Sequence, residues 1–150
     1  MNQEIERKYL VTSDCYKEMA VARYHIIQGY ISREKTGTVR VRITDDKAYL
    51  TIKGKPAAGH LARYEWEKEI DVHDAEELMK LCQGTIIDKT RWIVPAAEEG
   101  LKWEVDEFHG KHEGLVVAEI ELEREDQSFE KPDFIGDEVT HDPRYYNANM

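Results

Sequence analysis

The chain has 150 residues, of which 41% are hydrophobic and 35% charged, and its formal net charge is −10. This length predicts one domain over residues 1–150 with a core of its own. The acidity argues against nucleic-acid partners, because general nucleic-acid binding relies on basic side chains that displace counterions from phosphates.

The sequence gives no sign of a membrane partner. No apolar run approaches the roughly 20 residues that span a bilayer, and the N-terminal residues are acidic where a signal peptide is basic and then apolar. Cys15 and Cys82 are the only cysteines and lie far apart. Two ordinary thiols without a disulfide or metal spacing predict a cytoplasmic location.

The dominant sequence period is two, starting with EIERKYL, in which Glu4, Glu6 and Lys8 share one face. Polar and apolar residues that alternate in this way, with many β-branched and aromatic side chains, predict half-buried strands. Eight such strands are expected, over residues 5–11, 24–32, 38–44, 48–54, 63–70, 86–94, 101–108 and 116–124. Turn residues at short intervals between them predict antiparallel pairing, so the fold class is mainly β within α+β.

Two helices are predicted between the strands. Thr12 or Ser13 can cap a helix over 14–23, and Asp74 can cap one over 75–83 that ends before Gly84. The segment after residue 124 is less regular and is expected to contain short helical turns.

The charged strand faces carry repeated like-charge pairs at positions i and i+2. For a single strand, the ordinary interpretation is a face exposed to water. Like charges on one face are mildly destabilising, and five strands repeat the arrangement, which favours a ligand between them. Glutamate oxygens suit Mg²⁺ or Mn²⁺, and arginine and lysine suit phosphate. The alternation alone does not distinguish a closed barrel from an open sheet with one wet face.

The ordered motifs resemble the CYTH superfamily, the triphosphate tunnel metalloenzymes. Glu4-x-Glu6-x-Lys8 is similar to the family signature, and the match continues through Arg40-x-Arg42, Thr51-x-Lys53, Glu65-x-Glu67, Lys89-x-Arg91, Glu104-x-Asp106 and Glu119-x-Glu121. The final segment also resembles that of short bacterial inorganic triphosphatases. The resemblance implies an eight-stranded antiparallel closed barrel, with a charged lumen and a few flanking helices.

The resemblance also implies roles for individual residues. Metal would be held by Glu4, Glu6, Glu119 and Glu121, with Glu65, Glu67, Glu104 and Asp106 as supporting acids. Phosphate groups would be bound by Lys8, Arg40, Arg42, Lys53, Lys89 and Arg91. The eight acids and six bases sum to −2, so we expect divalent metal to be obligatory for binding a triphosphate of the same sign.

No nucleophile such as a Ser-His-Asp or Cys-His set is evident, and phosphoryl transfer to water needs mainly positioning and charge neutralisation. Lys8 and Lys89 are the candidates for proton transfer, because neighbouring cations lower the pKa of a lysine. Tyr30 is a third catalytic candidate, expected to hydrogen-bond Lys8.

The expected activity is therefore metal-dependent hydrolysis of a linear triphosphate, inorganic tripolyphosphate above all, to diphosphate and phosphate. A class IV-type adenylate cyclase, a thiamine triphosphatase and a non-catalytic polyphosphate- or nucleotide-binding module remain as alternatives. Two helices cover few of the apolar strand faces, so a homodimer is possible. His109 and His112 are assigned to an exposed turn, and residues 54–62 to a long hairpin loop near the tunnel mouth.

Overall fold

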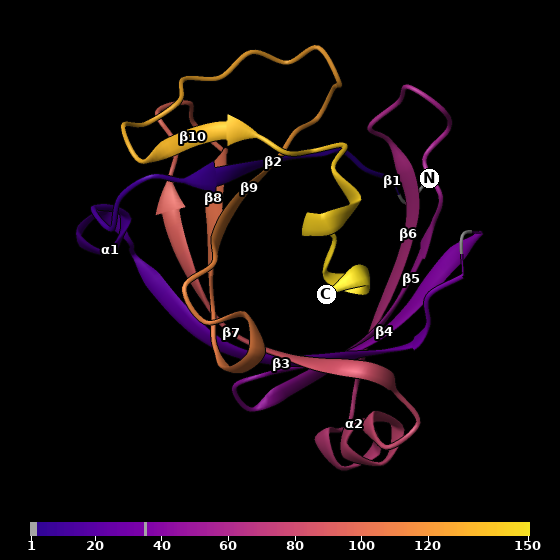
Figure 1. The fold of residues 1–150 in the computed structure, drawn as a ribbon. Helices are drawn as coiled ribbons and strands as arrows, with labels where there is room; N and C mark the ends of the chain where they lie inside the picture. The colour runs from indigo at the N-terminus through magenta and orange to yellow at the C-terminus, as the bar shows by residue number, and fades with distance from the viewer. Residues whose placement is uncertain (1–2, 35) are drawn as a thin grey trace.

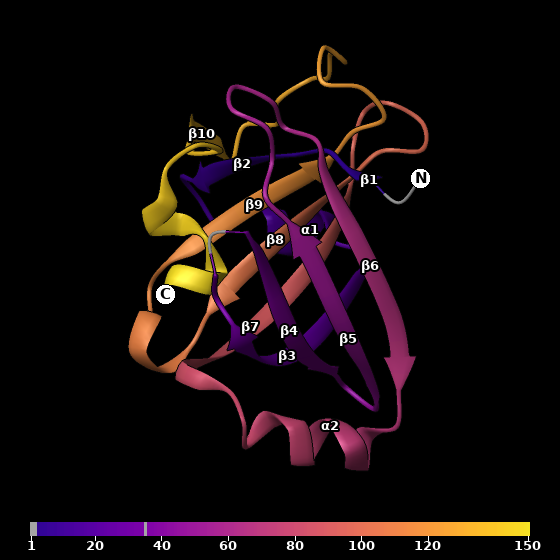
Figure 2. The ribbon, with the colours of Figure 1, turned by 90° about the vertical axis from the view of Figure 1, so that its right-hand side faces the viewer.

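The alternating segments pair into one antiparallel sheet in the computed structural model, which describes residues 3–34 and 36–150. The sheet bends around a central space, as Figure 1 shows along that space and Figure 2 from the side. Its strands are β1 (Gln3–Glu4), β2 (Glu6–Val11), β3 (Ala22–Ser32), β4 (Gly37–Thr44), β5 (Lys47–Gly54), β6 (Arg63–Ile70), β7 (Gln83–Pro95), β8 (Lys102–Phe108), β9 (Val116–Glu121) and β10 (Ile135–Glu138).

The described part of the chain has ten strands, so the expected number of eight was wrong. All eight expected segments contain strands; a short additional strand, β1, precedes the first of them and is separated from it at Ile5, and β10 is also additional. The order is β1-β6-β5-β4-β3-β7-β8-β9-β2-β10. The hydrogen-bonded sheet thus has two ends in place of a continuous ring. β1 pairs with β6 and β2 with β9, although only Ile5 separates them in the chain.

The register aligns the charged positions of neighbouring strands. Arg40 lies opposite Thr51, and Thr51 lies opposite Glu67. On the other side of the sheet, Arg91 lies opposite Asp106. Because side chains opposite each other in an antiparallel pair point to the same face, the motifs of separate strands form one continuous charged surface.

The apolar faces of the strands point outward, where helices and a long loop cover part of them. Trp103 is fully buried, with its ring centroid 5.7 Å from Tyr9 and 5.7 Å from Phe129, both in edge-to-face contacts. Phe129 and Phe134 belong to the segment between β9 and β10, so this loop supplies cover that two helices alone lack. A second cluster joins α2 to β4 and β5 through Ala75, Val41 and Ala48.

Both helices are present, but with bounds that differ from the expected ones. The helix α1 covers only Tyr16–Met19, because residues from Ala22 onward pair with β7 as part of β3. The helix α2 covers Val72–Met79, and its cap is Asp71, whose side chain accepts a hydrogen bond from the His73 N–H. Asp74, the expected cap, lies in the first turn of the helix. A carboxylate there also interacts favourably with the positive end of the helix dipole.

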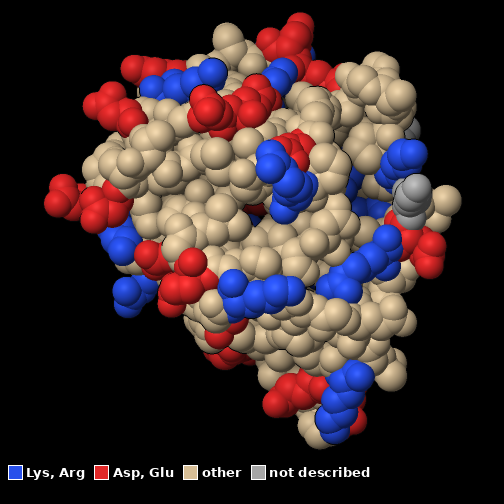
Figure 3. Space-filling view, in the orientation of Figure 1, with Lys and Arg blue, Asp and Glu red and all other residues tan. Residues whose placement is uncertain are grey.

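The C-terminal segment folds back over one end of the space that the strands surround (Figures 1 and 2). After β10 it forms two 3-10 helices, at Pro143–Tyr145 and Asn147–Asn149, as the expected helical turns. Figure 3 shows this end of the molecule covered largely by uncharged side chains, with Lys, Arg, Asp and Glu mainly around them. Among the described residues, no helix is long and apolar enough to cross a membrane.

Candidate active site

The charged faces of the strands line a cavity of about 830 Å³. Of the fifteen metal, phosphate-binding and catalytic candidates, all but Asp106 contribute to its wall, and Asp106 is buried behind Lys89 and Arg91. The fourteen that line the cavity are Glu4, Glu6, Lys8, Tyr30, Arg40, Arg42, Lys53, Glu65, Glu67, Lys89, Arg91, Glu104, Glu119 and Glu121. The like-charge pairs therefore face one another across an enclosed space, and the solvent-exposed interpretation does not hold for them.

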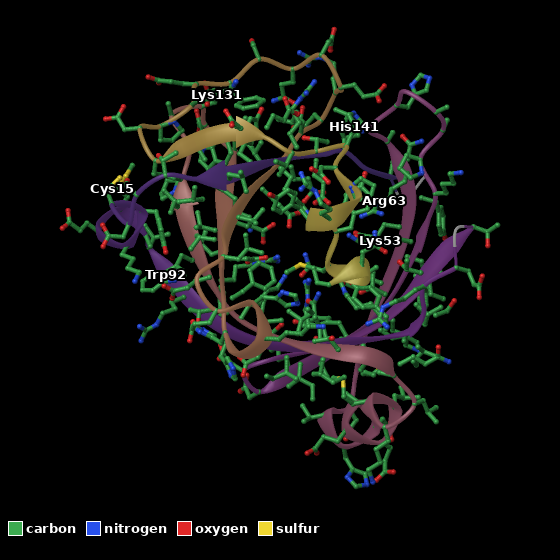
Figure 4. All side chains as sticks on the ribbon, in the orientation of Figure 1. Cys15, Lys53, Arg63, Trp92, Lys131 and His141 are labelled. Atoms are coloured by element: carbon green, nitrogen blue, oxygen red, sulfur yellow. The ribbon has the colours of Figure 1, made fainter. Side chains whose placement is uncertain are left out.

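Glu4 is held by two cations from the neighbouring strands. Lys53 Nζ lies 2.9 Å from both carboxylate oxygens, and Arg63 Nη2 lies 3.3 Å from Oε1. Figure 4 shows the Lys53 and Arg63 side chains on the inner side of β5 and β6. Burial by itself would raise the pKa of Glu4, but the attraction of Lys53 and Arg63 lowers it to about 2. Glu4 is therefore an anion at neutral pH.

Glu6 and Glu119 form a pair of carboxyl groups in contact. Burial and the charge of Glu119 raise the pKa of Glu6 well above its usual value. Burial also acts to raise that of Glu119, but Lys8 and the hydrogen bond from Glu6 lower it well below. Glu6 therefore holds a proton more strongly than Glu119 does. Two carboxyl groups in contact repel each other when both are ionised, and a divalent cation between them would relieve that repulsion.

The described residues contain no group of three or more His, Cys, Asp or Glu side chains already positioned around one point for a metal ion. The acids bind the cations of the cavity instead: Glu4 pairs with Lys53 and Arg63, and Glu104 with Arg91. A metal ion would need these carboxylates to turn away from their basic partners. Glu121 remains close to the acidic set, where burial and the charges of Glu4 and Glu104 raise its pKa.

Lys89 is 1% exposed and forms the centre of a second charged group. Its Nζ donates to Asp106 Oδ2 at 2.7 Å, while Arg91 forms a fork on both oxygens of the same carboxylate at 2.8 and 2.9 Å. Burial lowers the pKa of Lys89 to about 7, a shift that Asp106 opposes and that Arg91 and Arg42 increase. Lys89 is thus able to hold or release a proton near neutrality.

On the opposite flank, Arg40 and Arg42 are hydrogen-bonded by neutral side chains, and Arg40 Nη2 also lies 3.5 Å from Glu67 Oε1. Arg40 Nη2 donates to Thr51 Oγ1 at 3.2 Å, and Thr51 donates to Glu67 at 2.7 Å. Arg40 Nε is buried and has no hydrogen-bond partner among the described residues. Because a guanidinium stays charged, this orphaned donor on the wall of the cavity is suited to an anion.

The expected contact between Tyr30 and Lys8 is not found among the described residues. Lys8 Nζ donates instead to the main-chain oxygen of Tyr145 at 2.9 Å and lies 3.9 Å from Glu119 Oε1. The Tyr30 hydroxyl accepts from Gln28 Nε2 at 3.4 Å. The C-terminal segment lies where the contact was expected, and the irregular sequence of that segment did not predict its position.

Three further side chains belong to the site. Arg63, at the start of β6, forms ion pairs with Glu4 and Glu6. Its place in the alternation of β6 is compatible with a position in the tunnel, but equally with a solvated rim. Gln28 is fully buried on β3 and accepts from Arg42 Nε at 2.8 Å. Asn147 contacts both Gln28 and Lys89 from the C-terminal segment. No periodic signal marks Asn147, because it lies outside every strand.

The remaining features of the sequence lie where they were expected, in the outer part of the molecule or, for the loop after β5, near the cavity. His109 precedes a 3-10 helix at Gly110–His112 and faces Thr90, in line with the predicted turn. Trp92 and Cys15 lie on the outer side near α1 (Figure 4). The loop after β5 does reach the cavity, through Lys55, Pro56 and His60 among others.

Comparison with known proteins places this geometry in a family. A model of the CYTH domain matches residues 2–146. The chain belongs to the CYTH family. This CYTH protein is 48% identical over 151 residues to the inorganic triphosphatase of Acetivibrio thermocellus, covering 100% of this chain and 94% of that one. It is 33% identical over 150 residues to the inorganic triphosphatase of Nitrosomonas europaea, covering 98% and 95%.

Solved structures agree with the assignment to the CYTH family. The crystal structure of the inorganic triphosphatase NE1496 superposes with a TM-score of 0.69 at 31% identity, over 99% of this chain and 94% of that one. The structure of HpAC1 from Hippeastrum, described as an adenylyl cyclase with a dominant triphosphatase activity, superposes with a TM-score of 0.64 over 81% and 80%. At 18% identity, this second likeness concerns the fold alone.

Proposed function

We propose that this CYTH protein hydrolyses a linear triphosphate, inorganic tripolyphosphate above all, to diphosphate and phosphate with a divalent metal ion. The observation that carries the proposal is the cavity, whose wall contains both the acids and the six bases Lys8, Arg40, Arg42, Lys53, Lys89 and Arg91. A metal-bound polyphosphate needs both kinds of group within one enclosed space. The names of the two curated relatives support the same substrate.

We propose that the strands around the substrate number eight, with β1 and β2 acting as one strand interrupted at Ile5. The pairing of β1 with β6 and of β2 with β9 supports this, since the chain itself bridges the gap between those neighbours. β10 then lies outside the ring, on the far side of β2. Residues of β1 to β9 form a tunnel, and the C-terminal segment covers one of its ends.

The bases hold the phosphate chain. Arg40 Nε, which has no hydrogen-bond partner among the described residues, supplies one donor. Lys8, Lys53 and Arg91 supply positive charges, and in the free protein these side chains donate hydrogen bonds to carboxylates or main-chain oxygens. Binding of the substrate thus exchanges carboxylate partners for phosphate oxygens. Lys89, whose pKa is about 7, holds or accepts a proton beside the attacked phosphate. Asp106 fixes the positions of Lys89 and Arg91, since both of its oxygens are engaged by them.

The acids Glu6 and Glu119, with Glu4 and Glu121, would hold Mg²⁺ or Mn²⁺. When bound, such an ion neutralises phosphate charge and lowers the pKa of a water ligand. Lys8 favours the ionised form of Glu119, whereas burial and the charge of Glu119 favour the protonated form of Glu6.

The localisation and the assembly of the protein follow as lesser proposals. Cys15 and Cys82 are free thiols, which supports a reducing compartment such as the cytoplasm. Ile52 and Tyr64 on the outer face of β5 and β6 are 39% and 49% exposed, which supports pairing of two copies through this face.

The test is phosphate release from inorganic tripolyphosphate, ATP and thiamine triphosphate, each with Mg²⁺, Mn²⁺ or EDTA. Wild type is compared with Glu119→Gln and Arg40→Ala, and with Glu76→Gln on the exposed face of α2 as the matched control. We expect metal-dependent release from tripolyphosphate, at least about 100-fold slower in the two tunnel variants. Binding without release would identify a binding module, and cyclic product from ATP would identify a cyclase.

A further inference from the structure

The side chain of Asn147 connects the C-terminal segment to the floor of the cavity. Its Oδ1 accepts two hydrogen bonds, from Lys89 Nζ at 2.7 Å and from Gln28 Nε2 at 3.1 Å. Asn147 is itself a lining residue of the cavity. A segment that follows the last strand thus supplies a polar group next to the most buried lysine of the site.

The orientation of the Asn147 amide is fixed by its neighbours. Arg42 Nε is only a donor, so the atom of Gln28 that faces it must be the oxygen, at 2.8 Å. The nitrogen of Gln28 therefore faces Asn147 and donates to it. The ammonium of Lys89 is also only a donor. Two donors from different residues converge on one atom of Asn147, which must be its oxygen, and Nδ2 occupies the opposite position.

The nitrogen of this amide is left available. Among residues 3–34 and 36–150, no acceptor stands within hydrogen-bond distance of Asn147 Nδ2, whereas the equivalent nitrogen of Asn149 donates to the main-chain oxygen of Pro143 at 2.9 Å. Nor is Nδ2 among the buried polar atoms that lack a partner, so it is accessible to solvent, and it belongs to a residue that lines the cavity.

The segment that carries Asn147 is anchored to β2 through Lys8. Lys8 donates through its side chain to the main-chain oxygen of Tyr145 at 2.9 Å, and its main-chain N–H donates to Thr140 Oγ1 at 3.0 Å. The Val139 N–H donates to the main-chain oxygen of Lys8 at 2.8 Å. These bonds hold the segment against β2, so the Asn147 amide has a defined position relative to Lys8 and Lys89.

We propose that Asn147 is a substrate-binding residue, whose Nδ2 donates a hydrogen bond to an oxygen of the triphosphate chain bound between Lys8 and Lys89. This inference rests on the proposed function. The C-terminal segment then belongs to the phosphate site itself, and its contribution is a neutral donor whose direction Lys89 and Gln28 set. A neutral donor adds affinity for an anion without adding to the repulsion among the buried cations.

The decisive variant is Asn147→Asp. Aspartate keeps the shape of asparagine and an oxygen for Lys89 and Gln28, but it replaces the donor with a second acceptor. Asn147→Ala removes both halves of the amide. Asn149→Asp is the matched control, since it adds the same charge two residues further along the segment, at an exposed residue whose amide nitrogen is already engaged by Pro143.

The measurement is calorimetric binding of imidotriphosphate with Mg²⁺, together with KM and kcat on inorganic tripolyphosphate. We expect Asn147→Asp and Asn147→Ala each to weaken binding about 10-fold or more, and Asn149→Asp to change it less than about threefold. If Asn147→Asp binds as wild type does while Asn147→Ala is weakened, the residue only anchors Lys89 and Gln28, and the inference is overturned.

If Asn147→Asp and Asn149→Asp weaken binding of imidotriphosphate equally, the loss is due to the added charge. That result would also overturn the inference. A wild-type protein that neither binds imidotriphosphate nor hydrolyses tripolyphosphate would refute the proposed function as well. A wild type that does both, beside an unaffected Asn147→Asp, refutes the inference alone.

Discussion

Lys89 Nζ lies 2.7 Å from Asp106 Oδ2, and both residues are only 1% exposed. Asp106 also holds the guanidinium of Arg91, so one buried carboxylate balances two buried cations that belong to the same strand. Burial would raise the pKa of Asp106, but Arg91 and Lys89 lower it to about 2. The carboxylate of Asp106 is thus ionised at every pH at which the protein is expected to work, whereas Lys89 can titrate near neutrality.

Replacement of Asp106 by asparagine is expected to destabilise the protein strongly. The variant leaves Lys89 buried without a counter-ion and Arg91 with Glu104 alone, a change that costs about 3–5 kcal/mol. Urea unfolding in EDTA at neutral pH, followed by far-ultraviolet circular dichroism, measures the loss. Asp46→Asn in the exposed turn between β4 and β5 is the matched control and is expected to stay within about 0.5 kcal/mol of wild type. An Asp106→Asn protein as stable as this control would contradict the assigned role.

The docking of β10 is expected to weaken in acid through Glu138. Its carboxylate accepts from Arg7 at 2.9 Å and from the Thr140 hydroxyl. Partial burial opposes the shift, but these two partners lower the pKa of Glu138 below its usual 4.5. A group whose pKa is lower in the folded state stabilises above its unfolded pKa, and the contribution disappears as pH falls through the folded value.

Glu138→Gln should therefore be less stable than wild type at pH 7, and the difference should shrink as the pH falls below about 4.5. Thermal unfolding of both proteins from pH 7 to below about 4.5 measures this difference in stability. The control is Glu130→Gln, which changes an exposed residue of the preceding loop. A difference that stays constant with pH would show that the glutamate acts through shape alone.

The pairing of Glu6 with Glu119 predicts an effect on metal binding. Glu6→Gln keeps a hydrogen-bond donor toward Glu119 but cannot become a second carboxylate. We expect the Mg²⁺ concentration for half-maximal activity to rise at least about 10-fold, with the fold unchanged. A titration of phosphate release against Mg²⁺ measures this, and Glu76→Gln should titrate as wild type does. An unchanged titration in Glu6→Gln would remove Glu6 from the metal site.

The aromatic cluster outside the sheet predicts a purely structural variant. Trp103 is fully buried between β8 and the segment that carries Phe129 and Phe134. Trp103→Ala is expected to cost about 3–5 kcal/mol of unfolding free energy. Tyr64→Ala, which removes an aromatic ring that is 49% exposed, should cost far less. Denaturant unfolding compares the two, and similar losses would mean that the long loop does not depend on Trp103.

Much of the sheet and of the cavity wall could be predicted, because alternation records which side chains share a face. Arg40 and Arg42, or Lys89 and Arg91, lie where a period of two puts them. Alternation does not record which strands become neighbours, so the division of the first strand at Ile5 was missed. The helix cap was misplaced by three residues, since both Asp71 and Asp74 satisfy the local rule for a cap.

The contribution of the C-terminal segment could not be predicted from its residues. Asn147 and the main-chain oxygen of Tyr145 reach the site through two short 3-10 helices, which have no periodic pattern. Their place depends on long-range bonds such as that between Val139 and Lys8. Tertiary contacts of this kind become visible only when the fold is known.

Because of the break at Ile5, one short stretch of backbone connects the two sides of the cavity, which end in β6 and β9. Glu4 is attached to β6 through β1, while Glu6 is attached to β9 through β2. Any movement that spreads β6 from β9 pulls on these two glutamates in opposite directions. The width of the cavity and the distance between Glu4 and Glu6 are therefore coupled. A cation that draws these two acids together also narrows the cavity around a bound ligand.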